Sequence, residues 1–351
     1  RRAVEQLKAS YRALPPGAPP RLAKPTTNLF RFRSSGGAAR LSVRDLDQVI
    51  EVDPVARTAE VQGMTTYERL VDATLPHGLM PYVVPQLKTI TLGGAVTGLG
   101  IESTSFRYGL PHESVEEMEI LTGDGRVVVA TPDNEHADLY RAFPNSYGTL
   151  GYALRLRIRL LPVRPYVRLT HLRFTDAAKC MLVLQEICES GEFDGGAADF
   201  VDGTCFGPDE LYLTVGQFAD RAPYTSDYTG MRIYYRSIQQ RSRDWLTVRD
   251  YLWRWDTDWF WCSRAFGVQK PLIRSLVPRR WLRSDVYRRL VGLDQRYGLT
   301  ARIGRWRGRP PQESVIQDIE VPIERATEFL EFFHEKVGMT PVWLCPLKAQ
   351  A

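Results

Sequence analysis

The stretch TLGGAVTGLGIESTSFRYGL, residues 91–110, decides how the amino-terminal half of this chain is interpreted. It holds four glycines within eight positions, at Gly93, Gly94, Gly98 and Gly100. Glycine lets a backbone approach a neighbouring group closely and adopt conformations that other residues avoid. The run therefore suits a backbone that wraps a ligand, or tight turns in a β-rich domain, and its spacing alone leaves both interpretations open.

The common nucleotide-binding fingerprints do not fit this stretch. The βαβ dinucleotide motif needs a strand, then glycines, then a helix, with an acidic residue about 20 positions later. Here GIESTSFRYGL follows the glycines, and its β-branched, aromatic and glycine residues show no helical period. We therefore expect no helix after the glycines and no dinucleotide fold of that type. A Walker A sequence is absent as well.

Two other segments have the composition of a backbone cradle. RLAKPTTN (21–28) lies in a proline-rich loop, where helix is forbidden, and YGTLGY (147–152) precedes a strand pattern. Exposed N–H groups in such segments can bind phosphate or ring oxygens. An elongated ligand would contact all three segments if the fold brings them together.

Hydrophobic patterning predicts an α+β fold. Hairpins are expected over 46–64 and 114–132, and an amphipathic helix over 65–79, capped by Thr65 or Thr66 and ending near Gly78. The pattern from 147 to 174 is strand, with a domain boundary near 160–166. Beyond it, a helix over 175–190 and further strands suggest a helix packed on an antiparallel sheet. Regular βαβα alternation, the mark of a doubly wound sheet, is missing.

The length and amino-acid composition are those of a soluble globular protein. The 351 residues are 44% hydrophobic and 25% charged, and they suffice for two domains. No apolar run approaches the roughly 18 residues that a membrane span needs. Five cysteines without a CxxC pair favour a reducing, cytoplasmic setting, and five scattered histidines predict no metal site.

Basic charge is concentrated between residues 231 and 310. This segment has 18 Arg, 1 Lys and 6 Asp, so its formal charge is +13, against −8 for the rest of the chain. Six of the eight tryptophans fall within 245–281, many of them in YLWRWDTDWFWC. Aromatic and basic residues together suit the lip of a membrane-facing site. An aromatic core with outward-pointing arginines fits equally well, and nucleic acid is not expected as a partner.

Taken in order, these segments resemble the FAD domain of the vanillyl-alcohol oxidase and p-cresol methylhydroxylase superfamily. The resemblance rests on the proline-rich loop, VIEVDPVARTAEVQGM, GLMPYVVPQLKTITLGGAVTGLG, EEMEILTGDGRV and NSYGTLGYALRLRIRLLP. Within the superfamily, GLGIESTSFRYGL, VIQDIEVPI and MTPVWLCPL resemble the Δ24-sterol reductases and the bacterial methylene-fatty-acyl reductases that are similar to them. This implies a two-part FAD-binding domain over 1–164. An α+β substrate domain with an antiparallel sheet follows over 165–351 and includes a Trp- and Arg-rich insert at about 231–310.

The resemblance also implies where FAD binds. The first loop contains no His or Cys, so the cofactor is expected to be non-covalent. The residues implied for the FAD pyrophosphate are Arg21, Ala23, Lys24, Pro25, Thr26, Thr27 and Asn28. Those implied for the flavin and ribityl chain are Thr91, Gly93, Gly94, Gly98, Gly100, Ile101, Glu102 and Ser103, and Gly148, Thr149 and Gly151 complete the cradle.

The activity implied by the resemblance is reduction of an isolated C=C bond, with NADPH as electron donor. Such a reduction needs a hydride at one carbon and a proton at the other, and the protein must place the proton donor in a dry pocket. The candidate donors are Glu102, Tyr108 and His112. Burial beside an apolar substrate would raise the pKa of Glu102. A structural role for Glu102, as a hydrogen-bonding partner of the flavin or of a loop amide, is the alternative.

Two lipid substrates fit the resemblance, a 10-methylene fatty acyl chain and a sterol side chain with a Δ24 alkene. Arg outnumbers Lys by 39 to 7, as in GC-rich bacterial genomes, and no hydrophobic anchor opens the chain, so we expect the acyl substrate. An FAD-dependent alcohol or sugar oxidase and a catalytically silent flavoprotein remain as alternatives. Relatives continue past VWLCPL, so the carboxy-terminal part is expected to be incomplete. Peripheral membrane contact is expected through 231–310.

Overall fold

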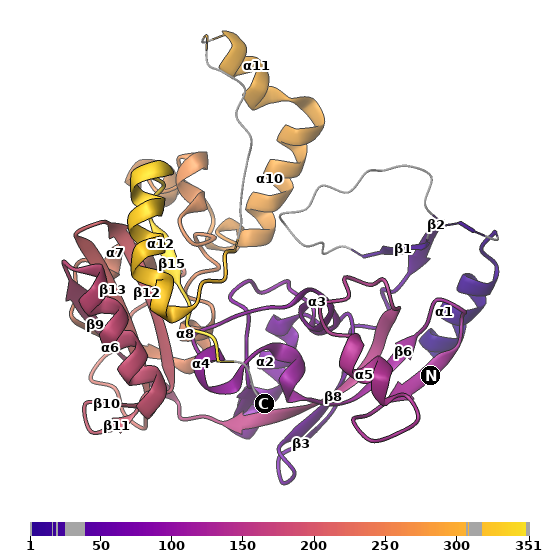
Figure 1. Ribbon diagram of the computed structural model, residues 1–351. Coiled ribbons are helices and arrows are strands. Elements are labelled where there is room, and N and C mark those ends of the chain that lie inside the picture. The colour runs from indigo at the N-terminus through magenta and orange to yellow at the C-terminus, as the bar shows by residue number, and fades with distance from the viewer. Residues whose placement is uncertain are drawn as a thin grey trace.

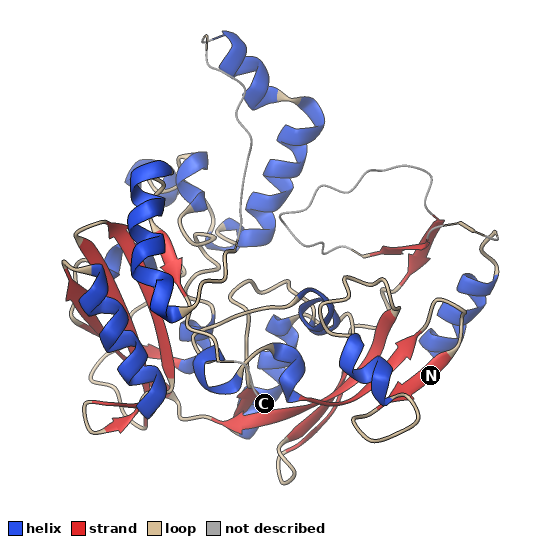
Figure 2. Cartoon of the chain, in the orientation of Figure 1, coloured by secondary structure: helices blue, strands red, loops and turns tan. Residues whose placement is uncertain are grey.

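The computed structural model describes residues 2–15, 17, 18, 20–24, 39–306, 308 and 318–348. Two antiparallel sheets with helices packed against them make up this part of the chain (Figures 1 and 2). The expected α+β class is confirmed. The prediction that Pro25–Asn28 bind a pyrophosphate falls on residues outside the described ranges.

The first sheet has the order β3-β4-β8-β6-β7, and β5 also pairs with β8. Its central strand is β8, in which Leu154, Leu156, Ile158 and Leu160 are all buried, the period of two that a strand requires. The hairpins β3–β4 and β6–β7 confirm the two predicted ones. The strands are β3 (Val49–Asp53), β4 (Thr58–Gln62), β5 (Leu79–Pro81), β6 (Val115–Leu121), β7 (Val127–Ala130) and β8 (Tyr152–Pro162).

Short helices and a small parallel strand pair surround this sheet. As predicted, α2 is capped by Thr66, whose side chain accepts a hydrogen bond from the Arg69 N–H, and Gly78 follows in the left-handed conformation. The elements are α1 (Arg2–Arg12), β1 (Pro20–Ala23), β2 (Ala39–Ser42), α2 (Tyr67–Thr74), η1 (Leu75–His77), α3 (Leu92–Gly98), α4 (Ser105–Tyr108), η2 (Pro111–Ser114) and α5 (Ala137–Ala142).

The expectation that no helix follows the glycines is wrong for one turn, and the sequence pattern did not show that the glycines themselves are helical. The glycine run itself forms α3, and the single turn α4 follows it. The side-chain oxygen of Thr91 caps α3 by accepting from the Gly94 N–H at 3.2 Å. Capping by threonine and close packing of small residues stabilise this helix in spite of the low helix propensity of glycine.

The second sheet has the order β14-β9-β13-β12-β15. Residues 163–165 connect β8 of the first sheet to β9 of the second. Helices α6 and α12 lie side by side against this sheet, at the left of Figure 1. Their apolar side chains share one buried cluster with the sheet. The elements are β9 (Tyr166–Phe174), α6 (Ala177–Ser190), β10 (Glu192–Phe193), β11 (Gly196–Ala197), β12 (Phe200–Gly207), β13 (Glu210–Ala219), β14 (Arg243–Thr247), α12 (Ile323–Lys336) and β15 (Val342–Leu344).

The Trp- and Arg-rich segment is divided between core and surface. Trp253, Trp255 and Trp259 are each at most 5% exposed, so the interpretation of YLWRWDTDWFWC as a surface lip is wrong and this stretch is aromatic core. Later elements leave the core, and α10 and α11 project away from both sheets (Figure 1). The elements here are α7 (Tyr234–Ile238), α8 (Val248–Leu252), η3 (Cys262–Phe266), α9 (Pro271–Leu276), η4 (Arg279–Trp281), α10 (Ser284–Tyr297) and α11 (Leu299–Trp306). In the described ranges, every helix is too short or too polar to cross a bilayer.

Candidate functional site

The described parts of the three cradle segments come together in the fold. The Tyr147 N–H donates to the Thr97 carbonyl at 2.8 Å, which joins the third segment to the end of α3. The Tyr152 hydroxyl donates to the Pro20 carbonyl at 3.2 Å, which joins the same segment to β1. Arg21, Ala23 and Lys24 therefore belong to the same neighbourhood as Gly148, Thr149 and Gly151. Contact of one elongated ligand with all three segments stays a prediction.

Two of the predicted glycines are required by backbone packing. A Cβ on Gly93 would lie 2.7 Å from the Gly63 carbonyl oxygen, and one on Gly151 would lie 2.3 Å from that of Leu121. The N–H groups of Gly93 and Gly94 already have acceptors, the Gly63 carbonyl and the Thr91 side chain. Gly93 holds α3 against the residue that follows β4, and Gly151 packs on Leu121 of β6. The contact of these glycines with FAD stays a prediction.

Gly98 differs from these two, because the fold gives it no packing role. The nearest atom to a Cβ placed there is Cε1 of Tyr147, at an ordinary contact distance of 3.9 Å. Gly98 lies at the end of α3, next to the 99–104 loop that carries the remaining predicted contacts.

Unpartnered polar atoms lie in and beside these segments. Within the described residues, Glu102 Oε2, Thr104 Oγ1, Ser146 Oγ and Gln86 Nε2 are buried without a hydrogen-bond partner. Folded proteins pair nearly all of their buried polar groups, so such a group of atoms calls for a ligand. The flavin ring carries hydrogen-bonding edges of the kind that would pair with such atoms.

Glu102 lies in a fully buried ion cluster that joins the two sheets. The side chain is 1% exposed, and its Oε1 accepts from the Ser103 N–H at 2.9 Å and from Arg254 Nη2 at 3.0 Å. The same Nη2 donates to Asp202 Oδ2 at 2.7 Å. Asp202 lies on β12, and its Oδ2 also accepts from Trp343 Nε1 of β15 at 3.2 Å.

Further contacts fasten the loop of Glu102 to the second sheet. The Val201 N–H donates to the Ser103 carbonyl at 2.7 Å, and the Ser103 and Tyr251 hydroxyls share a hydrogen bond of 2.9 Å. The guanidinium of Arg254 lies over the Tyr251 ring, 4.0 Å from its centre. Ser103, predicted to contact the flavin, thus has a structural role between the two halves.

The electrostatics of the cluster favour a protonated Glu102. Two carboxyl groups share one guanidinium, so the group is neutral only when one carboxyl holds a proton. Burial raises the pKa of Glu102, Arg254 lowers it by a smaller amount, and the charge of Asp202 raises it. The unpartnered Oε2 is then the oxygen that can donate a proton. Burial also raises the pKa of the nearby Cys345 thiol, which keeps it protonated.

Tyr108 and His112 lie apart from this cluster. The ring of Tyr108 packs on Tyr82 with centroids 4.8 Å apart. His112 lies in η2, where burial lowers its pKa and favours the neutral imidazole. Neither residue makes a hydrogen bond to Glu102 in the part of the chain that the structure describes, and their assignment as proton donors stays a prediction.

Sequence reasoning missed Arg254 and Asp202. The signal for Arg254 is the run LWRWD, in which a cation stands between tryptophans. Arginine is almost never fully buried unless it is paired, so an arginine inside an aromatic core implies a buried acid somewhere in the chain. Nothing in the sequence singles out Asp202 as that acid.

The chain is similar in sequence to FAD-binding proteins. Residues 25–131 match the family described as FAD binding domain. The chain is 28% identical over 332 residues to Delta(24)-sterol reductase from Arabidopsis thaliana, covering 86% of this chain and 55% of that protein. It is 29% identical over 322 residues to Delta(24)-sterol reductase from Homo sapiens, covering 87% and 57%.

Another relative matches a shorter part of the chain. Cytokinin dehydrogenase 7 from Oryza sativa subsp. japonica is 32% identical over 141 residues, covering 40% of this chain and 26% of that protein. The chain spans just over half the length of the two sterol reductases above. Residues 25–131 are thus similar to an FAD binding domain, and most of the chain is similar to the Δ24-sterol reductases.

Proposed function

We propose that this chain is an FAD-dependent reductase that takes electrons from NADPH and reduces an isolated C=C bond in a lipid. The match to an FAD binding domain and the similarity to Delta(24)-sterol reductases support the class of reaction. The observation that carries the proposal is the buried Glu102, whose pKa is raised and whose Oε2 has no partner among the described residues.

The residues of the cluster suit proton delivery to carbon. FAD bound in the cradle would supply the hydride. An isolated alkene has no carbonyl oxygen to polarise, so the protein must present a proton directly to carbon in a site without water. Glu102 can hold that proton at Oε2, while Ser103 and Arg254 fix Oε1. Arg254 and Asp202 act as positioning residues.

Two substrates compete under this proposal. The relatives' name points to the Δ24 double bond of a sterol, and the arginine-rich composition points to a methylene-branched acyl chain. Both present a branched, isolated alkene in an apolar chain. The chemistry required of Glu102 is the same for both.

An absorption spectrum followed by anaerobic titration tests the proposal. The purified protein should show bound flavin, NADPH should bleach it, and one of the two alkenes should restore the oxidised spectrum. A colourless protein that refuses added FAD, or a reduced flavin that neither alkene reoxidises, would overturn the proposal.

Glu102→Gln tests the proton donor. The variant should retain FAD and its reduction by NADPH, while reoxidation by the alkene should slow by about 10²–10⁴-fold. Glu51→Gln, at an exposed position of β3, is the matched control. If Glu102→Gln loses FAD, the residue is structural and the assignment fails.

We also propose that the surface beyond the aromatic core contacts an anionic membrane. Leu272 and Leu276 lie one turn apart on α9 and are each 83% exposed, and Trp281 is 53% exposed beside Arg279 and Arg280. Exposed apolar and aromatic side chains next to cations suit a lipid interface.

Co-sedimentation with phosphatidylserine vesicles tests this surface. The double substitution Leu272→Ser with Leu276→Ser should reduce binding, and raised salt should reduce it further. Leu182→Ser, on the exposed face of α6, serves as control. Binding that neither the double variant nor salt weakens would refute the contact.

A further inference from the structure

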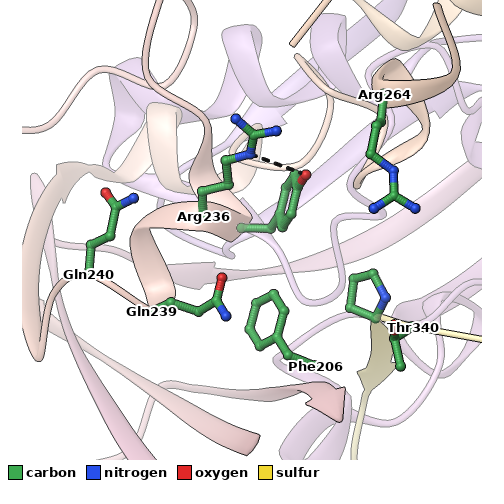
Figure 3. A pocket seen from close by; sticks show the side chains of 8 residues that line it. Phe206, Arg236, Gln239, Gln240, Arg264 and Thr340 are labelled. Carbon is green, nitrogen blue, oxygen red and sulfur yellow. Dashed lines mark hydrogen bonds between the residues drawn. The ribbon is translucent and has the colours of Figure 1, made fainter. Parts of the chain in front are cut away.

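A cavity at one end of the second sheet has no part in the site described so far. Its volume is about 340 Å³, within the range of small-molecule sites. The walls come from the end of β12, from α7, from η3 and from the residues just before β15 (Figure 3). The lining residues are Phe206, Tyr235, Arg236, Gln239, Gln240, Arg264, Thr340 and Pro341.

The two arginines of this cavity have no acidic partner in the described part of the chain. Arg236 donates to Gln269 Oε1 at 2.8 Å and to the Tyr235 hydroxyl at 3.4 Å, and both acceptors are neutral. Arg264 is exposed and forms no side-chain hydrogen bond or ion pair within the same ranges. Figure 3 shows Arg264 reaching in from one side and Arg236 with Gln239 on the other. Uncompensated guanidinium groups favour a phosphate, which they bind in a bidentate manner.

The remaining lining residues suit a flat ring. The rings of Phe206 and Tyr235 are nearly parallel, with an angle of 24° and centroids 6.5 Å apart. The carboxamides of Gln239 and Gln240 offer both donors and acceptors at the rim. Aromatic faces, amide groups and unpaired guanidiniums in one cavity match a ligand that joins a planar polar ring to a phosphate, which is the chemistry of a nucleotide.

The position of the cavity relates it to the Glu102 cluster. Phe206 lies four residues beyond Asp202 on β12, or about 13 Å along the strand. Pro341 directly precedes the neighbouring strand β15 and lies two residues before Trp343, which donates to Asp202. The cavity and the cluster therefore border the same two neighbouring strands, about 13 Å apart along β12.

We propose that this cavity binds the phosphate-bearing adenosine end of the dinucleotide electron donor. The inference rests on the proposed function for the identity of the donor, and on the two arginines for the phosphate. Arg264 makes the main contact with the phosphate in this proposal, because its guanidinium forms no ion pair within the described structure. A phospholipid headgroup carries the same phosphate chemistry without the ring.

Calorimetric titration of the purified holoprotein with adenosine 2′,5′-bisphosphate and with NADPH tests the cavity by binding alone. Arg264→Gln should weaken the Kd of both by about tenfold or more, with a smaller effect on NADH. Arg221→Gln, which removes an exposed cation outside the cavity, is the control and should bind as the unaltered protein does. The flavin spectrum should be the same in all three proteins.

Two results would overturn the inference. One is unchanged binding of the bisphosphate to Arg264→Gln. The other is displacement of the bisphosphate by a short-chain phosphatidic acid with an affinity that depends on Arg264, which would assign the cavity to a lipid headgroup. Since the bisphosphate cannot reduce a flavin, these outcomes are independent of alkene reduction. Failure of the proposed function appears separately, as a missing flavin spectrum.

Discussion

Replacing Arg254 with methionine is expected to destabilise the protein strongly. Its guanidinium donates to Glu102, to Asp202 and to the Tyr251 carbonyl, and its side chain is 0% exposed. With methionine at this position, the buried Asp202 carboxylate would lose its cationic partner, and Trp343 would remain as its side-chain donor in the described structure. Removing one partner of a buried ion pair costs about 3–5 kcal/mol, and loss of the contact with the Tyr251 ring acts in the same direction.

Urea unfolding followed by tryptophan fluorescence at pH 7.5 measures this cost. Asp202→Asn in the Arg254→Met background should recover about 1–3 kcal/mol of the free energy of unfolding, because the unpaired charge is then gone. Arg249→Met is the matched control, since Arg249 forms a half-exposed ion pair with Asp72 and should lose about 1 kcal/mol or less. A loss for Arg254→Met no larger than for this control, or strictly additive effects of the two substitutions, would refute the reasoning.

Gly151→Ala should lower the melting temperature clearly, because φ is +137° there and the new Cβ would meet the Leu121 carbonyl oxygen. Gly98→Ala should be neutral or stabilising by up to about 1 kcal/mol. Equal effects of the two substitutions in differential scanning fluorimetry would contradict these packing roles. Burial lowers the pKa of His171 to about 4, so its contribution to stability is complete above the unfolded pKa of about 6.5 and is lost as the pH falls toward 4. Urea unfolding should show that the free energy of unfolding falls by about 2 kcal/mol less between pH 7.5 and pH 5 in His171→Gln than in the unaltered protein. An equal fall in both proteins would contradict this role of His171.

The elements visible in the sequence are those that local patterns determine. The β3–β4 and β6–β7 hairpins alternate polar and apolar residues around turn residues, and α2 carries its own cap at Thr66. Helix α3 was not predictable in this way, because glycine disfavours helix and the contact that requires Gly93 is with Gly63, 30 residues earlier. Tertiary packing overrides propensity at that point.

The same limit applies to the site. An acid inside a glycine run could be identified from sequence, so Glu102 was a candidate. Its partner Arg254 is 152 residues away, and Asp202 is 52 residues from Arg254, so only the folded chain brings them together. Composition alone also could not separate the buried Trp253 and Trp255 from the exposed Trp281, since all three belong to one basic, aromatic segment.

The bond between Val201 and Ser103 and the ion cluster beside it make the acidity of Glu102 a joint property of both halves of the molecule. The loop of Glu102 follows α3 of the first half, while Asp202 and Arg254 belong to the second. Whenever the halves part, water reaches this carboxyl and its pKa falls back toward that of an ordinary glutamate. Retention of the proton is therefore a mark of correct assembly, and a chain whose halves have not yet docked has no acid ready at this position.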